Sequence, residues 1–446
     1  LTDRLQEAAG QRHDGLRPIE RRRTDLADSY ASSSRSRGNR PQEKSTPGAL
    51  PPEIAFLLSF GVPAALLQYA ATLARRQGVS ADAALLAEGL VSEDSFYRAF
   101  ADYVGVDFLD QGLRIVPPAD PLIAADQGYV QLAANPSRLK WLFAPSGAAI
   151  SGLIGAARGN NSRPLFAVTT RTRFLAALSE GPLRAATAAA PYCAERADAA
   201  LCARRALGRR SIAIGLVANV ALFCCLFQPV QALALVAALP LAALFLASVL
   251  LRLFACAESF DCEDRVFQAS DAELPIYTVI IPLYHEAEVA QQLALAIDRL
   301  DYPRAKLDVI FMVEQDDLDT AQALRRHAPR APHRILIAPD GSPRTKPRAM
   351  NIAAPFARGA LLTIYDAEDL PEPRQLRRAA ALFARRPERV ACLQASLCID
   401  NGAQNAIAAH FALEYAALFD VFNRGLSAMN LPMFLGGTSN HFRGIR

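Results

Sequence analysis

The chain has little excess charge of either sign. Its 446 residues carry 48 Lys and Arg against 44 Asp and Glu, which gives a formal net charge of +4 at pH 7. Binding to nucleic acid requires a dense basic face, and so small an excess does not provide one. The composition therefore argues against nucleic acid as a partner, while the length leaves room for two or three domains.

The eight cysteines lack the spacing of a disulfide framework or of a zinc site. No two of them form a C-x-x-C pair, and Cys224 and Cys225 fall inside an apolar run. Disulfide frameworks belong to small secreted domains, and zinc sites need close pairs of thiolates. We therefore expect reduced, buried thiols in a protein that faces the cytosol.

The first part of the sequence, residues 1–52, contains few large apolar side chains and lacks the apolar core of a secretory signal. Runs such as Arg21–Arg23 and Ser32–Arg35 cannot offset the entropy lost on ordering. We expect a disordered tail here. Contact of its arginines with anionic lipid headgroups is a weaker alternative.

No charged residue occurs between Ser211 and Leu251. A helix needs about 20 residues to cross the hydrocarbon core, so this run is long enough for two spans. We expect a transmembrane hairpin within residues 205–256, with helices at Ser211–Phe227 and Gln231–Phe254 and a kink at Pro240. A deeply buried helical hairpin in a soluble core is the alternative.

Arginines flank this run on both sides. Four precede the first expected span, and Arg252 closes the second. The positive-inside rule then places both ends of the run on the cytoplasmic side. We expect a multi-pass protein with the lipid bilayer as a partner.

Before the apolar run, residues 53–190 have the pattern of a small, mainly helical domain. Amphipathic helices are expected at Ala64–Gln77 and Ser92–Val104. Ser92 is a suitable N-cap for the second helix, because its hydroxyl can accept a hydrogen bond from the first turn. Gly89–Val91 forms the expected turn before it.

Beyond Asp271, apolar strands alternate with amphipathic helices such as Ala290–Leu300. This alternation is typical of a parallel α/β sheet, in which ligands bind at the carboxyl ends of the strands. The expected strands are Tyr277–Pro282, Leu307–Val313, Arg334–Ala338, Ala360–Tyr365 and Arg389–Leu393.

Polar side chains follow the first two strands. After Pro282, the ring of Tyr284 can stack on a nucleobase and the carboxylate of Glu286 can accept from a ring N–H. Glu314 and Asp316 follow the second strand and suit hydrogen bonds to a ribose or a base. Each residue alone is more often part of a turn, and their shared position at strand ends is what favours a binding role.

Three carboxylates, Asp366, Glu368 and Asp369, follow the fourth strand. They repel one another unless a cation is present, and hard oxygen ligands suit Mg²⁺ or Mn²⁺. Such a cation would stabilise a departing diphosphate as a Lewis acid. A solvated acidic turn would be the alternative for an isolated triplet.

Residues 272–446 resemble the GT-A catalytic domain of family-2 glycosyltransferases of the cellulose-synthase-like type. Four motifs occur in the order of the family: Pro282–Glu286, Lys346–Asn351, Asp366–Asp369 and Gly436–Arg443. The resemblance implies an α/β GT-A (Rossmann-like) fold. It also implies transfer of a sugar from a UDP-sugar with inversion at the anomeric carbon.

The resemblance also implies roles for individual residues. Lys346 would lie near the diphosphate, and Gln394 would line the sugar pocket. Because Glu368 stands where the family's metal motif has its second Asp, either Glu368 or Asp369 would join Asp366 at the metal. The implied acceptor-side residues are Gly437, Ser439, Asn440 and His441.

No residue of the chain is predicted to be the catalytic base. We expect His285 and His441 to orient hydrogen bonds and assign neither an acid–base role. In the family the base belongs to an acidic motif downstream of the loop Gly436–Arg443. We therefore expect it beyond Arg446, in a glycosyltransferase domain that is C-terminally incomplete in this sequence.

A second resemblance covers residues 53–190. The runs Leu85–Asp94 and Gly105–Asp110 are similar to the N-terminal domain of type II secretion and pilus ATPases. Some members bind cyclic di-GMP through an Arg-Leu-Gly opening, but Ser59–Gly61 and Ala81–Ala83 lack the arginine. We therefore expect weak or no binding of cyclic di-GMP and a plain docking or regulatory domain. A domain that binds cyclic di-GMP is the alternative.

The expected protein is therefore a glycosyltransferase of the bacterial inner (plasma) membrane, with its N-terminal and catalytic domains in the cytoplasm. It would transfer sugar to a glycan or to a lipid-linked acceptor, in the synthesis of an exopolysaccharide such as those of biofilms. The alternative is a non-catalytic regulatory membrane protein that keeps a sugar-nucleotide-binding fold.

Overall fold

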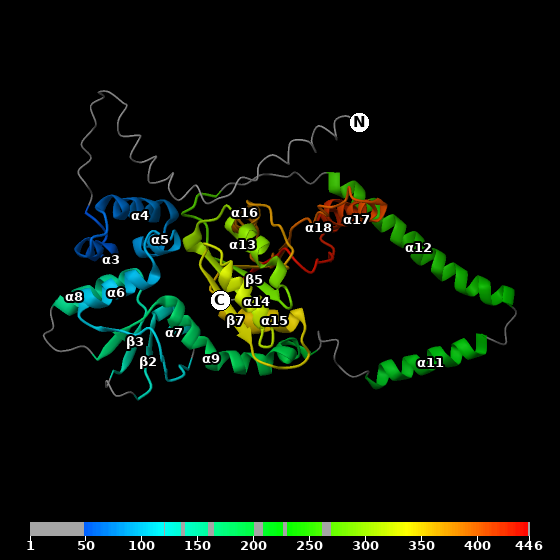
Figure 1. Cartoon of the computed structure of the whole chain (residues 1–446). Helices are drawn as coiled ribbons and strands as arrows, with labels where there is room; N and C mark the ends of the chain where they lie inside the picture. The colour runs from blue at the N-terminus through cyan, green and yellow to red at the C-terminus, as the bar shows by residue number, and fades with distance from the viewer. Residues whose placement is uncertain are drawn as a thin grey trace, which may run out of the picture. The chain divides into compact units, whose positions relative to one another are not determined.

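The computed structural model describes seven stretches of the chain, and their helices and strands lie within Leu50–Arg446 (Figure 1). The tail predicted for residues 1–52 falls almost wholly outside them, as do residues 226–229 at the junction of the two predicted spans. The described residues are 49–119, 121–134, 139–158, 165–199, 208–225, 230–260 and 269–444.

The N-terminal region contains the two predicted helices. The side-chain oxygen of Ser92 accepts a hydrogen bond from the Ser95 N–H at 3.1 Å and caps the second of them, as expected. In the core, the ring of Phe56 meets Phe96 and Phe100 edge-on, at centroid distances of 5.5 and 5.7 Å. The helices around this core are α3 (Pro52–Ala55), α4 (Ala64–Gln77), α5 (Ala81–Ala87), α6 (Glu93–Val104) and α8 (Ala148–Arg158).

The same region also holds a four-stranded sheet, in the order β1-β4-β3-β2, that the sequence pattern did not predict. Its strands are too short for an alternating pattern to stand out. Only the β2–β3 pair is antiparallel. The strands are β1 (Asp107–Phe108), β2 (Tyr129–Gln131), β3 (Trp141–Phe143) and β4 (Phe166–Val168).

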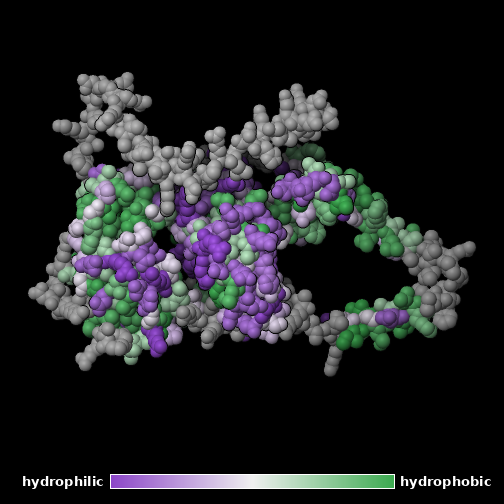
Figure 2. All heavy atoms as spheres, viewed as in Figure 1, coloured by the Kyte–Doolittle hydropathy of each residue, from purple (hydrophilic) through white to green (hydrophobic). Residues whose placement is uncertain are grey.

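Both helices predicted in the apolar run are present as α11 (Arg209–Cys225) and α12 (Val230–Phe260), and Pro240 lies inside the second. Among the described residues, one segment, Ala238–Phe260, is long and apolar enough to cross a membrane; α11 is apolar but shorter. Figure 2 shows apolar residues along both helices. A membrane span is thus supported by length and composition for α12 alone.

The C-terminal part forms an α/β fold around a six-stranded mixed sheet of order β7-β6-β5-β8-β10-β9. The first four strands are parallel, as predicted, whereas β10 is antiparallel to both of its neighbours. The strands are β5 (Tyr277–Leu283), β6 (Leu307–Glu314), β7 (His333–Ala338), β8 (Leu361–Ile364), β9 (Cys392–Gln394) and β10 (Asn440–Arg443).

Helices cover both faces of this sheet. On one face, Val279, Ile281 and Phe311 pack with apolar residues of α13 (Ala290–Asp298), α14 (Leu318–Arg326) and α16 (Gln375–Arg385). On the other, Ile310 and Met312 pack against α15 (Lys346–Ala353). Ala190, which follows α9 (Arg171–Ala189), joins the second cluster. The central strands β5 and β6 are therefore buried on both sides, as continuous apolar runs predict.

A buried carboxylate secures the amino-terminal edge of the sheet. Asp308 at the start of β6 accepts hydrogen bonds from Arg334, at 2.7 and 2.9 Å, and from Arg358, at 3.0 and 3.1 Å. The hydroxyl of Thr278 donates to it at 2.9 Å. Burial alone would raise the pKa of Asp308, but the two guanidiniums, with these hydrogen bonds, lower the pKa to about 2.

Helix α17 (Ala406–Ala416) has no buried residue, and Ile407 and Leu413 are 72% and 70% exposed. It continues through η8 (Ala417–Phe422) into α18 (Asn423–Ala428), which packs against α12. At Gly425 an added Cβ would lie 1.9 Å from the Ala255 carbonyl oxygen, so only glycine fits this contact. The exposed apolar surfaces of α12 and α17 are thus connected by a tight helix contact.

Replacement of Asp308 by Asn should lower the free energy of unfolding by about 3–5 kcal/mol, because two arginines lose their buried counter-charge. Chemical denaturation of the purified protein measures this. Asp110→Asn is the control, since Asp110 pairs with Arg98 at the surface and its loss should cost about 0–1 kcal/mol. Equal small losses in both variants would contradict a structural role for Asp308.

Candidate functional site

Several of the predicted site residues, among them Tyr284, Asp316 and Asp366, gather at the carboxyl edge of β5, β6 and β8. Ion pairs and a hydrogen bond connect the loops there: Arg344 contacts both Asp316 and Tyr284, and Lys346 contacts Asp366. Ligands of parallel α/β sheets bind at this edge. The structure therefore brings together side chains that the sequence connects only through their positions at strand ends.

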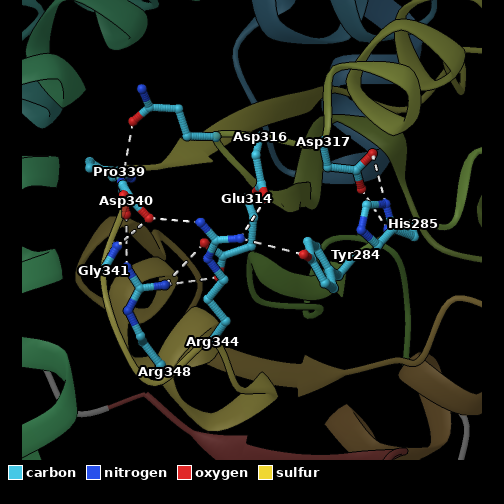
Figure 3. Close-up of polar contacts among 11 residues, drawn as sticks. Tyr284, His285, Glu314, Asp316, Asp317, Pro339, Asp340, Gly341, Arg344 and Arg348 are labelled. Carbon is cyan, nitrogen blue, oxygen red and sulfur yellow. Dashed lines mark hydrogen bonds and ion pairs between the residues drawn. The ribbon is translucent and has the colours of Figure 1, made fainter.

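One side of the site is built by the ends of β5 and β6 (Figure 3). The Tyr284 ring is 43% exposed and lies 4.0 Å from the His285 ring, centroid to centroid. The Arg344 guanidinium donates to the Tyr284 hydroxyl at 3.5 Å and forms ion pairs with Asp316 and Asp340. An exposed aromatic ring beside an anchored carboxylate is suited to a nucleoside.

Glu314 lies apart from that surface. Its two carboxylate oxygens accept from Arg348 at 2.9 and 3.0 Å, and both side chains are buried. Arg348 also donates to the Pro339 carbonyl at 2.7 Å. In contrast to the donor contact expected of it, the geometry gives Glu314 a structural role, because its carboxylate fixes the loop after β7 to the end of β6.

Asp317, the carboxylate that follows Asp316, holds two parts of the site together. Its carboxylate accepts from the backbone N–H of His285 at 2.6 Å and of Thr320 at 3.2 Å. It therefore caps α14 and fixes the loop after β5, in which His285 has a φ of 59°. The sequence contains a signal for this capping role, because Asp is a preferred N-cap residue directly before a helix.

The other side of the site is the acidic turn after β8. Asp366 pairs with Lys346, which also donates to the Gly437 carbonyl at 2.7 Å. The Asp369 carboxylate turns inward, where it accepts from the Asp366 N–H at 2.8 Å and from the Thr438 hydroxyl. Burial raises the pKa of Asp369, and the charges of Asp366 and Glu368 raise the pKa further.

This inward turn alters the expected metal set. Among the described residues, no three Asp, Glu, His or Cys side chains lie close enough together to hold a metal ion. Asp369 is occupied by hydrogen bonds within the turn, which leaves Asp366 and the exposed Glu368 as candidate ligands. Two carboxylates fit Mg²⁺ or Mn²⁺, which complete their coordination with water and phosphate oxygens.

Glu286 faces the same group of acids. Burial raises its pKa, and the nearby carboxylates of Glu368, Asp317 and Asp366 raise the pKa further. Its backbone N–H donates to the Thr320 hydroxyl at 2.9 Å. The structure thus places Glu286 near the acidic turn, where its charge adds to a field that attracts cations.

Gln394 supports the loop that carries Gly437. Its side-chain oxygen accepts from the Gly436 N–H at 2.7 Å, and its side-chain nitrogen donates to the Thr438 carbonyl at 3.2 Å. These contacts hold the loop beside Lys346. The Gln394 side-chain nitrogen also donates to the Ala395 carbonyl at 2.9 Å.

Of the four expected acceptor-side residues, Gly437 alone is exposed. Ser439, Asn440 and His441 are buried, because the segment expected to be a loop continues into strand β10. His441 Nδ1 lies 2.7 Å from the Tyr277 hydroxyl. Burial lowers the pKa of His441 to about 4, so its ring is neutral at physiological pH.

The comparisons with known proteins concern this α/β domain. Residues 275–429 match the sequence model described as "Glycosyltransferase like family 2". No curated protein matches the sequence. Residues 275–429 are thus similar to family-2 glycosyltransferases, which agrees with the expected enzyme class, a glycosyltransferase.

Three solved structures are similar to parts of the chain. A mannosyltransferase from Pyrobaculum calidifontis, in complex with GDP-Man and Mn²⁺, is 24% identical, with a TM-score of 0.35 over 45% of this chain and 53% of its own. Mannosyl-3-phosphoglycerate synthase from Rubrobacter xylanophilus is 16% identical, with a TM-score of 0.26 over 38% of this chain and 54% of its own. Glucosyl-3-phosphoglycerate synthase from Mycobacterium tuberculosis, in complex with UDP, is 14% identical, with a TM-score of 0.23 over 38% of this chain and 57% of its own. The chain thus spans little more than half of each.

His441 provides a test of the buried side of the domain. Its depressed pKa means that the unfolded state binds a proton that the folded state does not, between the unfolded pKa of about 6.5 and the folded pKa of about 4. Stability should fall as the pH drops through this window. His441→Gln should flatten that slope in denaturant unfolding at several pH values. An unchanged slope would show that the ring titrates in the folded protein.

Proposed function

We propose that the chain is an inverting, membrane-bound glycosyltransferase that uses a UDP-sugar and elongates a glycan or a lipid-linked acceptor during exopolysaccharide synthesis. One observation carries this proposal. Tyr284 and Asp316 form a surface suited to a nucleoside, while Asp366 and Lys346 form a charged surface suited to a diphosphate, at the same edge of the sheet. A sugar nucleotide has these two ends in the same molecule.

In this proposal, Asp366 and Glu368 are the residues that would hold Mg²⁺ or Mn²⁺, and the cation would supply positive charge next to the leaving diphosphate. Lys346 contributes a compact positive charge beside them. It is held by the Asp366 carboxylate and by the Gly437 carbonyl, so its position is fixed before the donor arrives. Glu286 adds negative charge and favours retention of the cation.

The proposed membrane association rests on α12 and α17. Helix α17 is apolar on nearly all sides, apart from the pair His410–Glu414 with 3.4 Å between Nε2 and Oε1. A helix of this kind needs an apolar environment around it. At about 1.5 Å per residue it is too short to cross a bilayer. Since α18 attaches it to α12, we propose that α17 lies in the membrane surface on the cytoplasmic side.

Residues 53–190 are proposed to be a docking or regulatory domain with weak or no affinity for cyclic di-GMP. Where an arginine would be needed for phosphate binding, α5 begins with Ala81 and Asp82. The buried Asp82 carboxylate accepts from the Gly147 N–H at 3.0 Å. An acidic side chain at this position disfavours a phosphate, so a regulatory protein is the preferred partner.

A non-catalytic regulatory membrane protein is the second candidate. The observation in its favour is the ion pair between Lys346 and Asp366, because this pair engages a carboxylate that is expected to bind the metal. Hydrolysis or transfer of the sugar from a UDP-sugar by the purified protein would decide against this candidate.

The affinity for UDP should depend on Mn²⁺ or Mg²⁺. Asp366→Ala should weaken UDP binding at least tenfold, about 1.4 kcal/mol, because it removes an anionic ligand of the cation. Calorimetry measures this, and Asp400→Ala, an exposed acid of the same domain, should leave the affinity unchanged. Equal UDP affinity with and without EDTA would contradict the metal assignment.

The membrane proposal predicts lipid contact at α17. A fluorescent label on Leu413→Cys, in a protein otherwise free of cysteine, should be quenched by brominated lipids after reconstitution. The same label on Arg325→Cys, an exposed position of α14, should not be quenched. Strong quenching at Arg325 or none at Leu413 would refute the proposed depth of α17.

A further inference from the structure

The end of β6 is joined residue by residue to the segment of residues 339–348. Glu314 pairs with Arg348, and the Gln315 side chain accepts from the Asp340 N–H at 3.2 Å. The next residue, Asp316, pairs with Arg344. Three successive residues of one segment thus bind three residues of the other.

The segment is also fixed at its own ends. The Pro339 carbonyl accepts from Arg348, and Gly341 lies so close that an added Cβ would be 2.6 Å from Arg348 Nη2. Toward the other end, Lys346 is held by Asp366 and by the Gly437 carbonyl. Arg344 is therefore presented from a fixed backbone between the two sides of the site.

Arg344 holds two carboxylates with its planar fork. Nη1 contacts Asp316 Oδ2 and the Tyr284 hydroxyl, while Nη2 donates to Asp340 Oδ1 at 2.8 Å. A guanidinium that bridges two carboxylates has a defined plane, which a lysine ammonium would lack. Among the described residues, Asp316 Oδ1 has no hydrogen-bond partner and stays available to a ligand.

Stability does not explain this arrangement. The side chains of Arg344, Asp316 and Asp340 are 36%, 44% and 76% exposed, and exposed ion pairs contribute about 0–1 kcal/mol. What the contact does determine is orientation. With Oδ2 of Asp316 held by Arg344, the other oxygen can accept from a ribose hydroxyl or from a ring N–H of a base.

We propose that Arg344 is a positioning residue, which orients Asp316 and Tyr284 for the nucleoside part of the donor. This inference rests on the proposed function, since it assigns a nucleoside to the same site. Arg344 acts through Asp316, so the two residues should behave as one unit in binding.

The test is a double-mutant cycle on UDP binding, measured by calorimetry with Mn²⁺ present. Arg344→Gln and Asp316→Asn should each weaken binding about tenfold, and the double variant should be no weaker than Asp316→Asn alone. Arg344→Lys should recover part of the loss, since it keeps the charge without the fork. Arg374→Gln is the matched control, because Arg374 forms an exposed pair with Asp301 at 3.4 Å.

The outcomes separate the inference from the function on which it rests. If the wild-type protein binds UDP and Arg344→Gln binds it equally well, the positioning role is wrong. Losses that multiply in the double variant would show that Arg344 acts independently of Asp316, which also overturns it. Unfolding temperatures equal to the wild-type value exclude loss of fold. A wild-type protein that fails to bind UDP with Mn²⁺ would overturn the proposed function itself.

Discussion

Crowding of negative charge at one edge of a parallel sheet is the constraint on which this site depends. The strands β5, β6 and β8 end together, and the carboxylates of Glu286, Asp316, Asp317, Asp366, Glu368 and Asp369 follow them. So many negative charges in a small region repel one another unless cations are near. The protein supplies two such cations, Arg344 and Lys346, from a single segment.

The opposite edge of the sheet is stabilised by the reverse arrangement. There one buried carboxylate, Asp308, holds two arginines, and removal of the acid would leave buried positive charge without a partner. The two edges differ in exposure as well. Asp308 is buried, whereas Asp316 and Asp366 remain partly accessible. A fixed edge and an open edge on the same strands are what a rigid binding site requires.

The sequence predicted the parallel strands well, because β5 and β6 are short, continuous apolar runs, which are typical of strands buried on both faces. It did not predict β10. The segment Asn440–Arg443 is short and mostly polar. Its burial depends on pairing with β8 and β9 and on a contact with the Tyr277 hydroxyl, which is distant in sequence. The expected loop residues Ser439 and His441 are buried for the same reason.

Strand-end residues were predicted as a group, but their individual directions were not. Glu314 and Asp316 look alike in sequence, yet the first is buried with Arg348 and the second is exposed with Arg344. Which acid points inward depends on where a loop after the next strand places its arginines, and no local pattern encodes that. Arg344 had no sequence signal for the same reason, whereas Asp317 carried the N-cap signal of the helix that it begins.

We propose that the edge formed by β5, β6 and β8 binds a sugar nucleotide together with a divalent cation. The most direct measurement is a structure of the protein with UDP and Mn²⁺, with the metal located by its anomalous scattering. We expect the manganese peak beside Asp366 and Glu368, and the base beside Tyr284 and Asp316. Manganese or UDP bound elsewhere, with this edge left empty, would contradict it.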